Sequence, residues 1–253
     1  MIWKLFDIRD QVAMITGGSS GIGLAIAETL TKAGAKVAIV NRDADVGRAV
    51  ATKLVSLGGQ AHAFPVDVGV KENVESVVEA IISHFGGIDI LVNSAGINIR
   101  KKAIDFSLSD WQKILDINLT GTFAVCQAVG RHMISRRKGR IINISSVAAL
   151  VGLPDRAPYC ASKAGVSQLT KVLAVEWAAY GVTVNAIGPG FIKTPLIVDL
   201  LNDPSFQKKI EDTVPMQRVG ETSDLQGIVL VLCSGAGAYI TGQTIYIDGG
   251  MSL

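Results

Sequence analysis

Seven short apolar runs rich in valine and isoleucine alternate with longer stretches of helical periodicity along the chain. A strand whose successive residues are all apolar is buried on both faces, as in parallel sheets covered by helices. The helical stretches are long enough to cross the sheet and start a parallel neighbour. The pattern therefore predicts a doubly wound α/β fold with helices on both faces of a seven-stranded parallel sheet. The predicted strands are Val12 to Ile15, Val37 to Val40, Ala61 to Val66, Ile88 to Val92, Ile141 to Ile144, Val182 to Ile187 and Thr244 to Ile247.

Length and composition predict one domain over residues 1–253. A chain of 253 residues with 49% hydrophobic residues can form one large core. The longest helical patterns run from Trp111 to Met133 and from Tyr159 to Ala178. The basic cluster at 136–138 fits a helix C-terminus, where positive charge is favoured. The segment from Thr194 to Gly220 holds three prolines, and we interpret it as a lid over a bound ligand.

Charge and cysteine content exclude several classes of function. The net charge of +2 comes from basic residues spread along the chain, which does not favour nucleic-acid binding. Cys126, Cys160 and Cys233 are odd in number and far apart, so they predict neither a disulfide framework nor a metal site. No segment reaches about 18 uninterrupted apolar residues, the length that would span a membrane. We expect a cytoplasmic protein with no membrane association.

A glycine-rich turn follows the first predicted strand. The segment from Thr16 to Gly23 contains four glycines and leads into a helical pattern from Leu24 to Leu30. Such a turn presents backbone N–H groups and a helix N-terminus to a diphosphate, although the same glycines could only shape a tight turn. The residues in this turn that we predict to bind a cofactor containing a diphosphate are Gly17, Ser19, Ser20, Gly21, Ile22 and Gly23.

The residues after the second strand predict which nicotinamide cofactor is used. An acidic residue there would bind the ribose hydroxyls of NAD and repel the extra phosphate of NADP. The chain instead has Asn41 followed by Arg42, and a guanidinium can pair bidentately with a phosphate. We therefore expect NADP in preference to NAD, while an isolated arginine here could also be a solvated surface charge.

Two further strand ends carry candidate cofactor contacts. Asp67 and Val68 follow the third strand, where a carboxylate could accept a hydrogen bond from an adenine amino group. Asn93, Ala95 and Gly96 follow the fourth, where small residues let a ligand pass close to the backbone. Ordinary turn chemistry is the alternative explanation for both segments.

Tyr159 and Lys163 are four residues apart, which on a helix places an ammonium beside a phenol. A fixed cation stabilises the phenolate and lowers the tyrosine pKa from about 10 towards neutrality. The pair then acts as a proton donor or acceptor. Taken alone, the spacing also fits a surface lysine beside a half-buried tyrosine.

Taken together, these motifs resemble the short-chain dehydrogenase/reductase family over nearly the whole chain, and the resemblance implies a Rossmann fold. They occur in the family's order along the sequence. One departure is Ser94, where the family more often has a second asparagine. The matching segments are Thr16 to Gly23, Asn93 to Gly96, Asn118, Ile144 to Ser146, Tyr159 to Lys163, Pro189-Gly190 and Asp248 to Gly250.

The resemblance implies catalytic roles for Asn118, Ser146, Tyr159 and Lys163. Tyr159 would be the acid in reduction and the base in oxidation, while Lys163 would lower its pKa and bind the nicotinamide ribose. Ser146 would orient the substrate oxygen; its thirteen-residue spacing from Tyr159 favours it over Ser145. Asn118 would hold a water that relays protons. The cofactor contacts that the resemblance adds after the sixth strand are Pro189, Gly190, Ile192 and Thr194.

The substrate is predicted by a basic loop and by the overall resemblance. Arg100, Lys101 and Lys102 follow the fourth strand and could bind a carboxylate, although a solvated loop is as good an explanation. The chain resembles gluconate 5-dehydrogenases and related sugar-acid reductases, which implies a substrate such as 5-keto-gluconate. The main alternative is a 3-oxoacyl thioester reductase, and a lesser one is a protein that binds nucleotide without turnover.

The resemblance also implies a homotetramer. Small residues on the two long helical patterns would allow close contact between helices, within one chain or between chains. These residues are Gly121, Ala124, Ala128, Ala161, Ala164 and Gly165.

Overall fold

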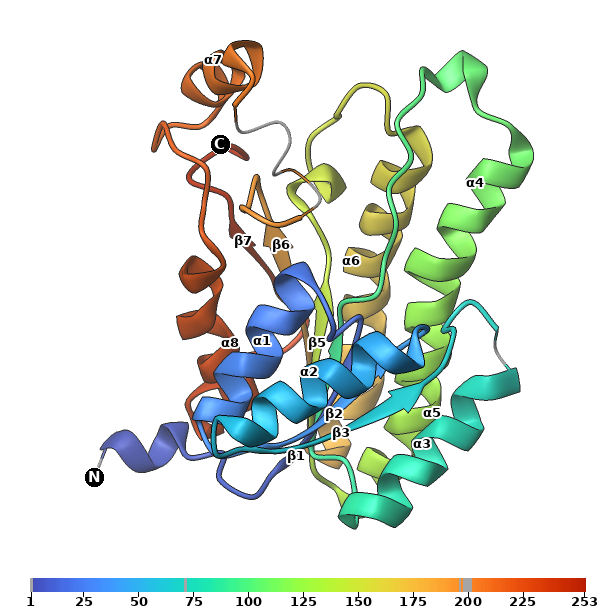
Figure 1. Ribbon diagram of the computed structural model, residues 1–253, viewed down its shortest axis with the longest axis vertical. Coiled ribbons are helices and arrows are strands. Elements are labelled where there is room, and N and C mark those ends of the chain that lie inside the picture. Colours follow the sequence, from blue (N-terminus) through green and yellow to red (C-terminus); the bar gives the residue numbers. More distant parts are fainter. Residues whose placement is uncertain (1, 71, 196, 198–201) are drawn as a thin grey trace.

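The computed structural model describes residues 2–70, 72–195, 197 and 202–253, and its centre is a seven-stranded parallel sheet (Figure 1). The strand order is β3-β2-β1-β4-β5-β6-β7, with every pair parallel. All seven predicted strands are confirmed. Their bounds are β1 Val12–Thr16, β2 Lys36–Asn41, β3 Gln60–Pro65, β4 Ile90–Asn93, β5 Gly139–Ile144, β6 Val182–Pro189 and β7 Thr244–Ile247.

Helices cover both faces of the sheet, as the alternating pattern predicts. One apolar core lies under α1, α2 and α8, and a second lies under α3, α5 and α6. Each central strand supplies side chains alternately to the two cores, which explains why β1 is buried at every position. The helices are α1 Gly21–Lys32, α2 Ala44–Ser56, α3 Glu72–Phe85, α4 Leu108–Leu115, α5 Gly121–Arg136, α6 Ala157–Trp177, α7 Pro204–Thr213 and α8 Gln226–Cys233.

The edge strand β3 differs from the prediction that every strand is apolar on both faces. Its burial alternates, with Gln60 and His62 exposed and Phe64 buried. Strand β3 pairs only with β2, because it is at the edge of the sheet. Its buried residue Phe64 packs in the same core as the helix α3. An edge position tolerates such a pattern because one row of side chains can remain in water.

The predicted helix from Trp111 to Met133 is interrupted in the structure. A π-helical turn, Asp116–Thr120, separates α4 from α5. Such wide turns are rare and concentrate at functional sites. This turn contains Asn118, whose side chain is fully buried.

The segment interpreted as a lid contains α7, which packs through Phe206 and Ile210 onto Val214 and Phe191. Ile192 at the start of this region forms a parallel bridge with Gly220 at its end. Positions 196 and 198–201 lie outside the described residues. Closure of this segment over a ligand therefore stays a prediction.

The two halves of the sheet meet between β1 and β4. From β1 the chain adds strands on one side, and from β4 it adds them on the other side. Ligands of open α/β sheets bind beyond the carboxyl ends of the strands at this point. The hydroxyl of Thr16, at the end of β1, accepts hydrogen bonds from the backbone N–H groups of Ser94 (3.2 Å) and Ala95 (3.3 Å) after β4. This one side chain holds the two strand ends together.

A buried chain of polar side chains joins β4, β5 and α6. Asn93 Nδ2 donates to Asn143 Oδ1 at 2.9 Å, and Asn143 Nδ2 donates to Thr170 Oγ1 at 2.9 Å. Thr170 in turn donates to the carbonyl of Val166 at 2.8 Å. These bonds fix the helix that carries Tyr159 and Lys163 against the sheet.

We predict that Asn143→Ala destabilises the protein by about 1–3 kcal/mol, because it removes a partner from two buried polar groups. The matched control is Asn73→Ala, which makes the same change at an exposed position of α3 and should alter stability by less than about 0.5 kcal/mol. Urea unfolding followed by circular dichroism measures both. Equal unfolding midpoints for the two variants would contradict a structural role for this chain.

Candidate active site

The glycine turn has no room for side chains at two of its glycines. Gly17 has a φ of +65°, and a Cβ there would lie 2.8 Å from the backbone nitrogen of Ala95. A Cβ on Gly23 would lie 2.2 Å from the carbonyl oxygen of Gly17. Helix α1 begins at Gly21, and the preceding Ser20 makes no side-chain cap. The turn thus leaves the N-terminal N–H groups of α1 uncapped by Ser20 and lets a ligand approach the backbone, as a diphosphate requires.

Two pockets adjoin each other over this turn. The first, of about 480 Å³, extends across the ends of β2 and β3, and the second, of about 400 Å³, extends towards α6 and the end of β6. They share Gly17, Ala95, Gly96 and Ile97. A dinucleotide fits this arrangement, with its diphosphate at the glycine turn and one nucleoside in each pocket.

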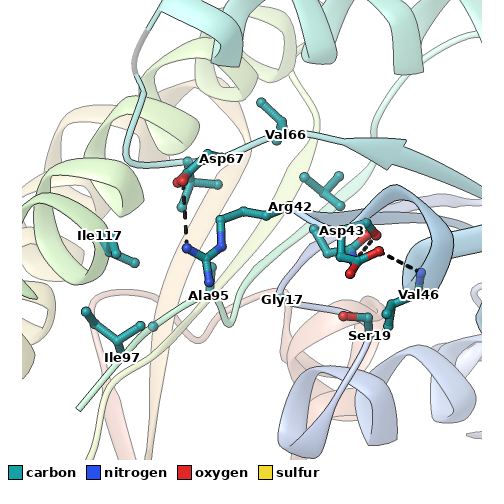
Figure 2. Close-up of a pocket in the computed structure, with 14 residues that line it drawn as sticks. Gly17, Ser19, Arg42, Asp43, Val46, Val66, Asp67, Ala95, Ile97 and Ile117 are labelled. Carbon is teal, nitrogen blue, oxygen red and sulfur yellow. Dashed lines mark hydrogen bonds and ion pairs between the residues drawn. The ribbon is translucent and has the colours of Figure 1, made fainter. Parts of the chain in front are cut away.

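The first pocket contains most of the residues predicted for the adenosine end (Figure 2). Ser19, Arg42, Asp67 and Val68 line it. The exposed guanidinium of Arg42 lies 3.9 Å from the carboxylate of Asp67, measured from Nη1 to Oδ2. Asp67 also accepts a hydrogen bond from the N–H of Gly69 at 2.9 Å, so its carboxylate is held by its own turn.

The side chain of Asn41 is turned towards α2, although the residue lines the first pocket. Its Nδ2 donates to the carbonyl of Asp43 at 2.7 Å, and its Oδ1 would be only 2.3 Å from a Cβ on Gly47. Asp43, which the sequence analysis did not select, also lines the pocket. Its carboxylate caps α2 by accepting from the N–H groups of Asp45 and Val46.

Asn93, predicted to contact the cofactor, has a side chain that points away from both pockets. Asn93 is buried, bonds to Asn143 and Cys126, and is absent from both pocket walls. Alternate side chains of a strand point to opposite faces, and this one points into the core. Ala95 and Gly96, beyond the strand end, line both pockets.

Lys163 and Tyr159 both line the second pocket. The lysine is 5% exposed; its Nζ donates to the carbonyl of Ile144 at 2.7 Å and lies 5.7 Å from the centre of the Tyr159 ring. Burial lowers the pKa of Lys163 to about 8. The ammonium therefore remains mostly protonated at neutral pH, beside the phenol.

The pKa of Tyr159 departs from expectation. Burial raises it above its ordinary value, opposed by a hydrogen bond with Ser146 and by the charge of Arg156. The prediction that the lysine lowers this pKa is therefore not met by the protein's own groups, because desolvation of the phenolate outweighs the favourable contacts. At neutral pH the group is a protonated phenol and thus a hydrogen-bond donor.

The two serines at the end of β5 have different surroundings. Ser145 Oγ donates to the carbonyl of Lys163 at 3.0 Å and bonds to Ser167 Oγ at 2.8 Å, so it ties the strand end to α6. Ser146 Oγ accepts from the N–H of Ala148 at 3.1 Å and lies near enough to Tyr159 to oppose the rise of the tyrosine pKa. Ser146 is therefore the serine placed to meet a substrate oxygen together with Tyr159.

Asn118 fixes the loop after β4. Its Oδ1 accepts from the N–H of Ile97 at 2.8 Å, and its Nδ2 donates to the Ile97 carbonyl at 2.9 Å and to Ser162 Oγ at 3.2 Å. A Cβ on Gly96 would lie 3.3 Å from Asn118 Oδ1 and 3.6 Å from Lys163 Nζ. Asn118 and Lys163 thus come together around Gly96.

The residues after β6 close the other side of the second pocket. Pro189, Gly190, Ile192 and Thr194, for which the resemblance implies cofactor contacts, all line it. The side chain of Thr194 would lie 3.7 Å from a Cβ on Gly21, so it faces the glycine turn. Arg100, in contrast, is exposed and lies on neither pocket wall.

Asn98 is a site residue that the sequence analysis missed. It lines the second pocket, and its buried Oδ1 has no hydrogen-bond partner among the described residues. Asparagine in a loop after a strand carries no distinctive sequence signal. Its amide is available to a ligand hydroxyl.

The site combines a phosphate-binding turn between β1 and β4 with an adjoining pocket that contains a serine, a tyrosine and a lysine. This combination is typical of a nucleotide-dependent oxidoreductase. A family profile described as "Enoyl-(Acyl carrier protein) reductase" matches residues 17–252. The chain belongs to the short-chain dehydrogenase/reductase family, as the sequence resemblance implies. It is an NAD(P)-dependent enzyme of this family acting on CH–OH groups.

Relatives with different substrates are similar over almost their whole length. The chain is 41% identical to a 3-oxoacyl-[acyl-carrier-protein] reductase of Synechocystis sp. over 244 residues, 95% of this chain and 96% of the relative. It is 38% identical to an NAD-dependent glycerol dehydrogenase of Listeria innocua, covering 99% and 97%. The crystal structure of a gluconate 5-dehydrogenase from Burkholderia cenocepacia in complex with NADP and tartrate matches at a TM-score of 0.96, with 36% identity and coverage of 100% and 99%.

The described residues contain no group of three or more His, Cys, Asp or Glu side chains that could hold a metal ion. No helix among them is both long and apolar enough to cross a membrane.

We predict that Gly17→Ala weakens NADPH binding at least tenfold, because the new methyl group meets the Ala95 backbone and displaces the turn. The control is Gly58→Ala, which also has a positive φ (+89°) but no atom within 4 Å of its Cβ. Quenching of protein fluorescence by NADPH measures both dissociation constants. Similar affinities for the two variants would argue against a role of the turn in binding.

Proposed function

We propose that the protein is an NADP-dependent oxidoreductase that interconverts a ketone and a secondary alcohol on a small sugar acid such as 5-keto-gluconate. The observation that carries this proposal is the grouping of Ser146, Tyr159 and Lys163 in a pocket that shares its wall with the glycine turn. When bound, the nicotinamide cofactor supplies or accepts the hydride. The protein supplies the proton and holds the substrate oxygen.

In the reduction direction, Tyr159 is the general acid. Its raised pKa keeps the phenol protonated, so it can donate a hydrogen bond to a carbonyl oxygen and then a proton to the developing alkoxide. Ser146 is a neighbouring hydroxyl that donates a second hydrogen bond to the same oxygen. Both bonds strengthen as negative charge grows, which lowers the barrier to reduction.

In the oxidation direction, Tyr159 must lose its proton, and Lys163 makes this easier. The ammonium near the ring stabilises the phenolate once it forms. The lysine pKa of about 8 also allows it to exchange a proton near neutral pH. We propose that Asn118, which lies beside Lys163 across Gly96, holds the water through which this proton reaches solvent.

The preference for NADP rests on charge at the end of β2. Asn41 is neutral there, and the exposed guanidinium of Arg42 is available to a 2′-phosphate. The carboxylate of Asp43 would repel a phosphate, but it is held by two N–H groups at the positive end of α2. NADP is also the cofactor in the gluconate 5-dehydrogenase structure, although the glycerol dehydrogenase is named as NAD-dependent.

Reduction of a 3-oxoacyl thioester is the second candidate function. The Synechocystis relative supports it at 41% identity. In that case the exposed basic residues Arg100 and Lys102 would face an acidic carrier protein or the phosphates of coenzyme A. Nucleotide binding without turnover is a much weaker candidate, because the serine, tyrosine, lysine and asparagine are all present.

We also propose a homotetramer in the cytoplasm. The outer side of α6 exposes Val172 (45%) and Val175 (83%), which a second chain would cover. Gly165 on the same helix is already used within the chain, where a Cβ would meet Leu119 at 2.8 Å. The molecular mass in solution tests the assembly.

The substrate class is tested by the initial rate of NADPH oxidation with 5-keto-D-gluconate and, separately, with acetoacetyl coenzyme A. We expect the keto acid to be reduced with the higher kcat/KM. A clear preference for the thioester would move the protein to acyl reduction.

We predict that Tyr159→Phe lowers kcat with the faster substrate by at least about a hundredfold, because general acid catalysis contributes factors of about 10² to 10⁴. The dissociation constant of NADPH should change little. The control is Tyr239→Phe, which removes the same hydroxyl from a fully exposed ring. Near wild-type turnover of Tyr159→Phe would exclude it as the acid.

We predict that Arg42→Ala raises the KM for NADPH at least tenfold and leaves the KM for NADH nearly unchanged, because only NADPH carries the phosphate. Arg48→Ala is the control, since Arg48 is also an exposed arginine but pairs with Asp45 on α2. Steady-state rates with both cofactors give the ratio. Parallel increases for NADPH and NADH would show that Arg42 does not select the phosphate.

A further inference from the structure

Arg156 is an unusual residue at the start of the helix that carries the active site. It occupies the N-cap position of α6, where serine, threonine, aspartate or asparagine normally bonds to a helix N–H group, and it makes no such bond. A guanidinium is also electrostatically unfavourable at the positive end of a helix. Nothing in the structure of α6 itself accounts for an arginine at this position.

The guanidinium of Arg156 is partly buried without a partner. Its Nε is buried and has no hydrogen bond among the described residues, where the side chain also makes no ion pair. Burial is the main reason that its pKa lies below the ordinary arginine value. A buried donor of this kind costs free energy unless something bonds to it.

The backbone before Arg156 holds it in place. Asp155 adopts a left-handed conformation with a φ of +62°, which is uncommon for a residue other than glycine. Its carbonyl accepts a hydrogen bond from the N–H of Lys101 at 3.1 Å. The turn that presents Arg156 is therefore tied to the loop after β4, which also contains Asn98 and Arg100.

Arg156 lies close to Tyr159, although it is on neither of the two pocket walls. It immediately precedes α6, and Tyr159 is three positions further along the chain, near enough for the charge of Arg156 to act on the phenol. Each residue affects the pKa of the other. The charge of Arg156 opposes the rise of the tyrosine pKa, and Tyr159 in turn favours the protonated form of the arginine. The charge of Arg100 also acts on Arg156, and it disfavours the protonated form.

The local charges are not balanced by acidic side chains. The nearby Lys101 pairs with Asp110 at 2.5 Å, but in the described part of the chain neither Arg100 nor Arg156 makes an ion pair. Two guanidiniums that repel each other beside an active-site phenol form a site for an anion. Asn98, with its unpaired buried oxygen on the pocket wall, adds an acceptor for a hydroxyl group.

We propose that Arg156 binds the carboxylate of the substrate and is the main residue that selects an anionic sugar acid over a neutral polyol. The inference rests on the proposed function in one respect, that the substrate carbonyl is held by Tyr159. Arg100, at the exposed mouth, adds attraction at longer range. Asn98 binds a hydroxyl between the reacting carbon and the carboxylate.

The test is the affinity of the NADPH-saturated enzyme for D-gluconate and for D-glucitol, measured by titration calorimetry. Both are alcohols and do not react with the reduced cofactor, and they differ in one carboxylate. We expect the wild type to bind gluconate at least tenfold more tightly. Arg156→Gln should bring gluconate to within about twofold of glucitol, with glucitol affinity unchanged, and Arg156→Lys should keep part of the preference.

Three results would overturn the proposal. The first is a wild type with no preference for gluconate. The second is an equal loss of both ligands in Arg156→Gln, which would indicate a structural role. The third is loss of the preference in Arg100→Gln but not in Arg156→Gln, which would assign the carboxylate to Arg100.

Failure of the proposed function is detected separately. If NADPH is not consumed with 5-keto-D-gluconate or with the neutral ketone dihydroxyacetone, the proposed reaction is wrong, while the binding titration still decides the anion site.

If Arg156→Gln does not fold, as judged by its thermal unfolding, Arg156→Lys decides the proposal. A gluconate preference that is reduced but still present in Arg156→Lys supports it, and an unchanged preference or an equal weakening of both ligands overturns it.

Discussion

The close approach of the backbone after β1 to the backbone after β4 is the constraint on which the site depends. Gly17 has no room for a Cβ because the nitrogen of Ala95 lies 2.8 Å from that position, and Thr16 bonds to the same turn. This contact joins the two pockets through shared walls. A methyl group at this point would meet the backbone of Ala95 and displace the turn that both pockets share.

Burial decides the proton chemistry in the second pocket. It lowers the pKa of Lys163 to about 8 and raises that of Tyr159, so one cause moves the two values apart and leaves the lysine the more easily deprotonated group. Each shift disfavours the charged form of its group. Near neutral pH the phenol therefore stays protonated and can act as an acid, while Lys163 is the group of the pair that can exchange its proton.

The sequence predicts the parts of this structure that depend on periodicity and on glycine, since the seven strands and the turn after β1 follow from local pattern. It does not predict where individual polar side chains point. Asn41 and Asn93 both end buried strands, yet Asn41 bonds to the carbonyl of Asp43 before α2 and Asn93 bonds to Asn143 in the core. The π-helical turn around Asn118 is likewise hidden, because a single helical pattern runs through it.

Arg156 illustrates why substrate recognition is the hardest property to read from such a chain. The predicted cofactor contacts lie at strand ends, where the fold determines the backbone and so restricts the residue type. Arg156 lies in a turn whose path depends on a left-handed Asp155 and on a hydrogen bond to Lys101, contacts between segments far apart in sequence. Its position violates the usual preference for helix caps, and a local cost without a structural gain is expected where a ligand supplies the missing partner. Relatives with thioester, polyol and sugar-acid substrates can therefore share one fold while differing in turns of this kind.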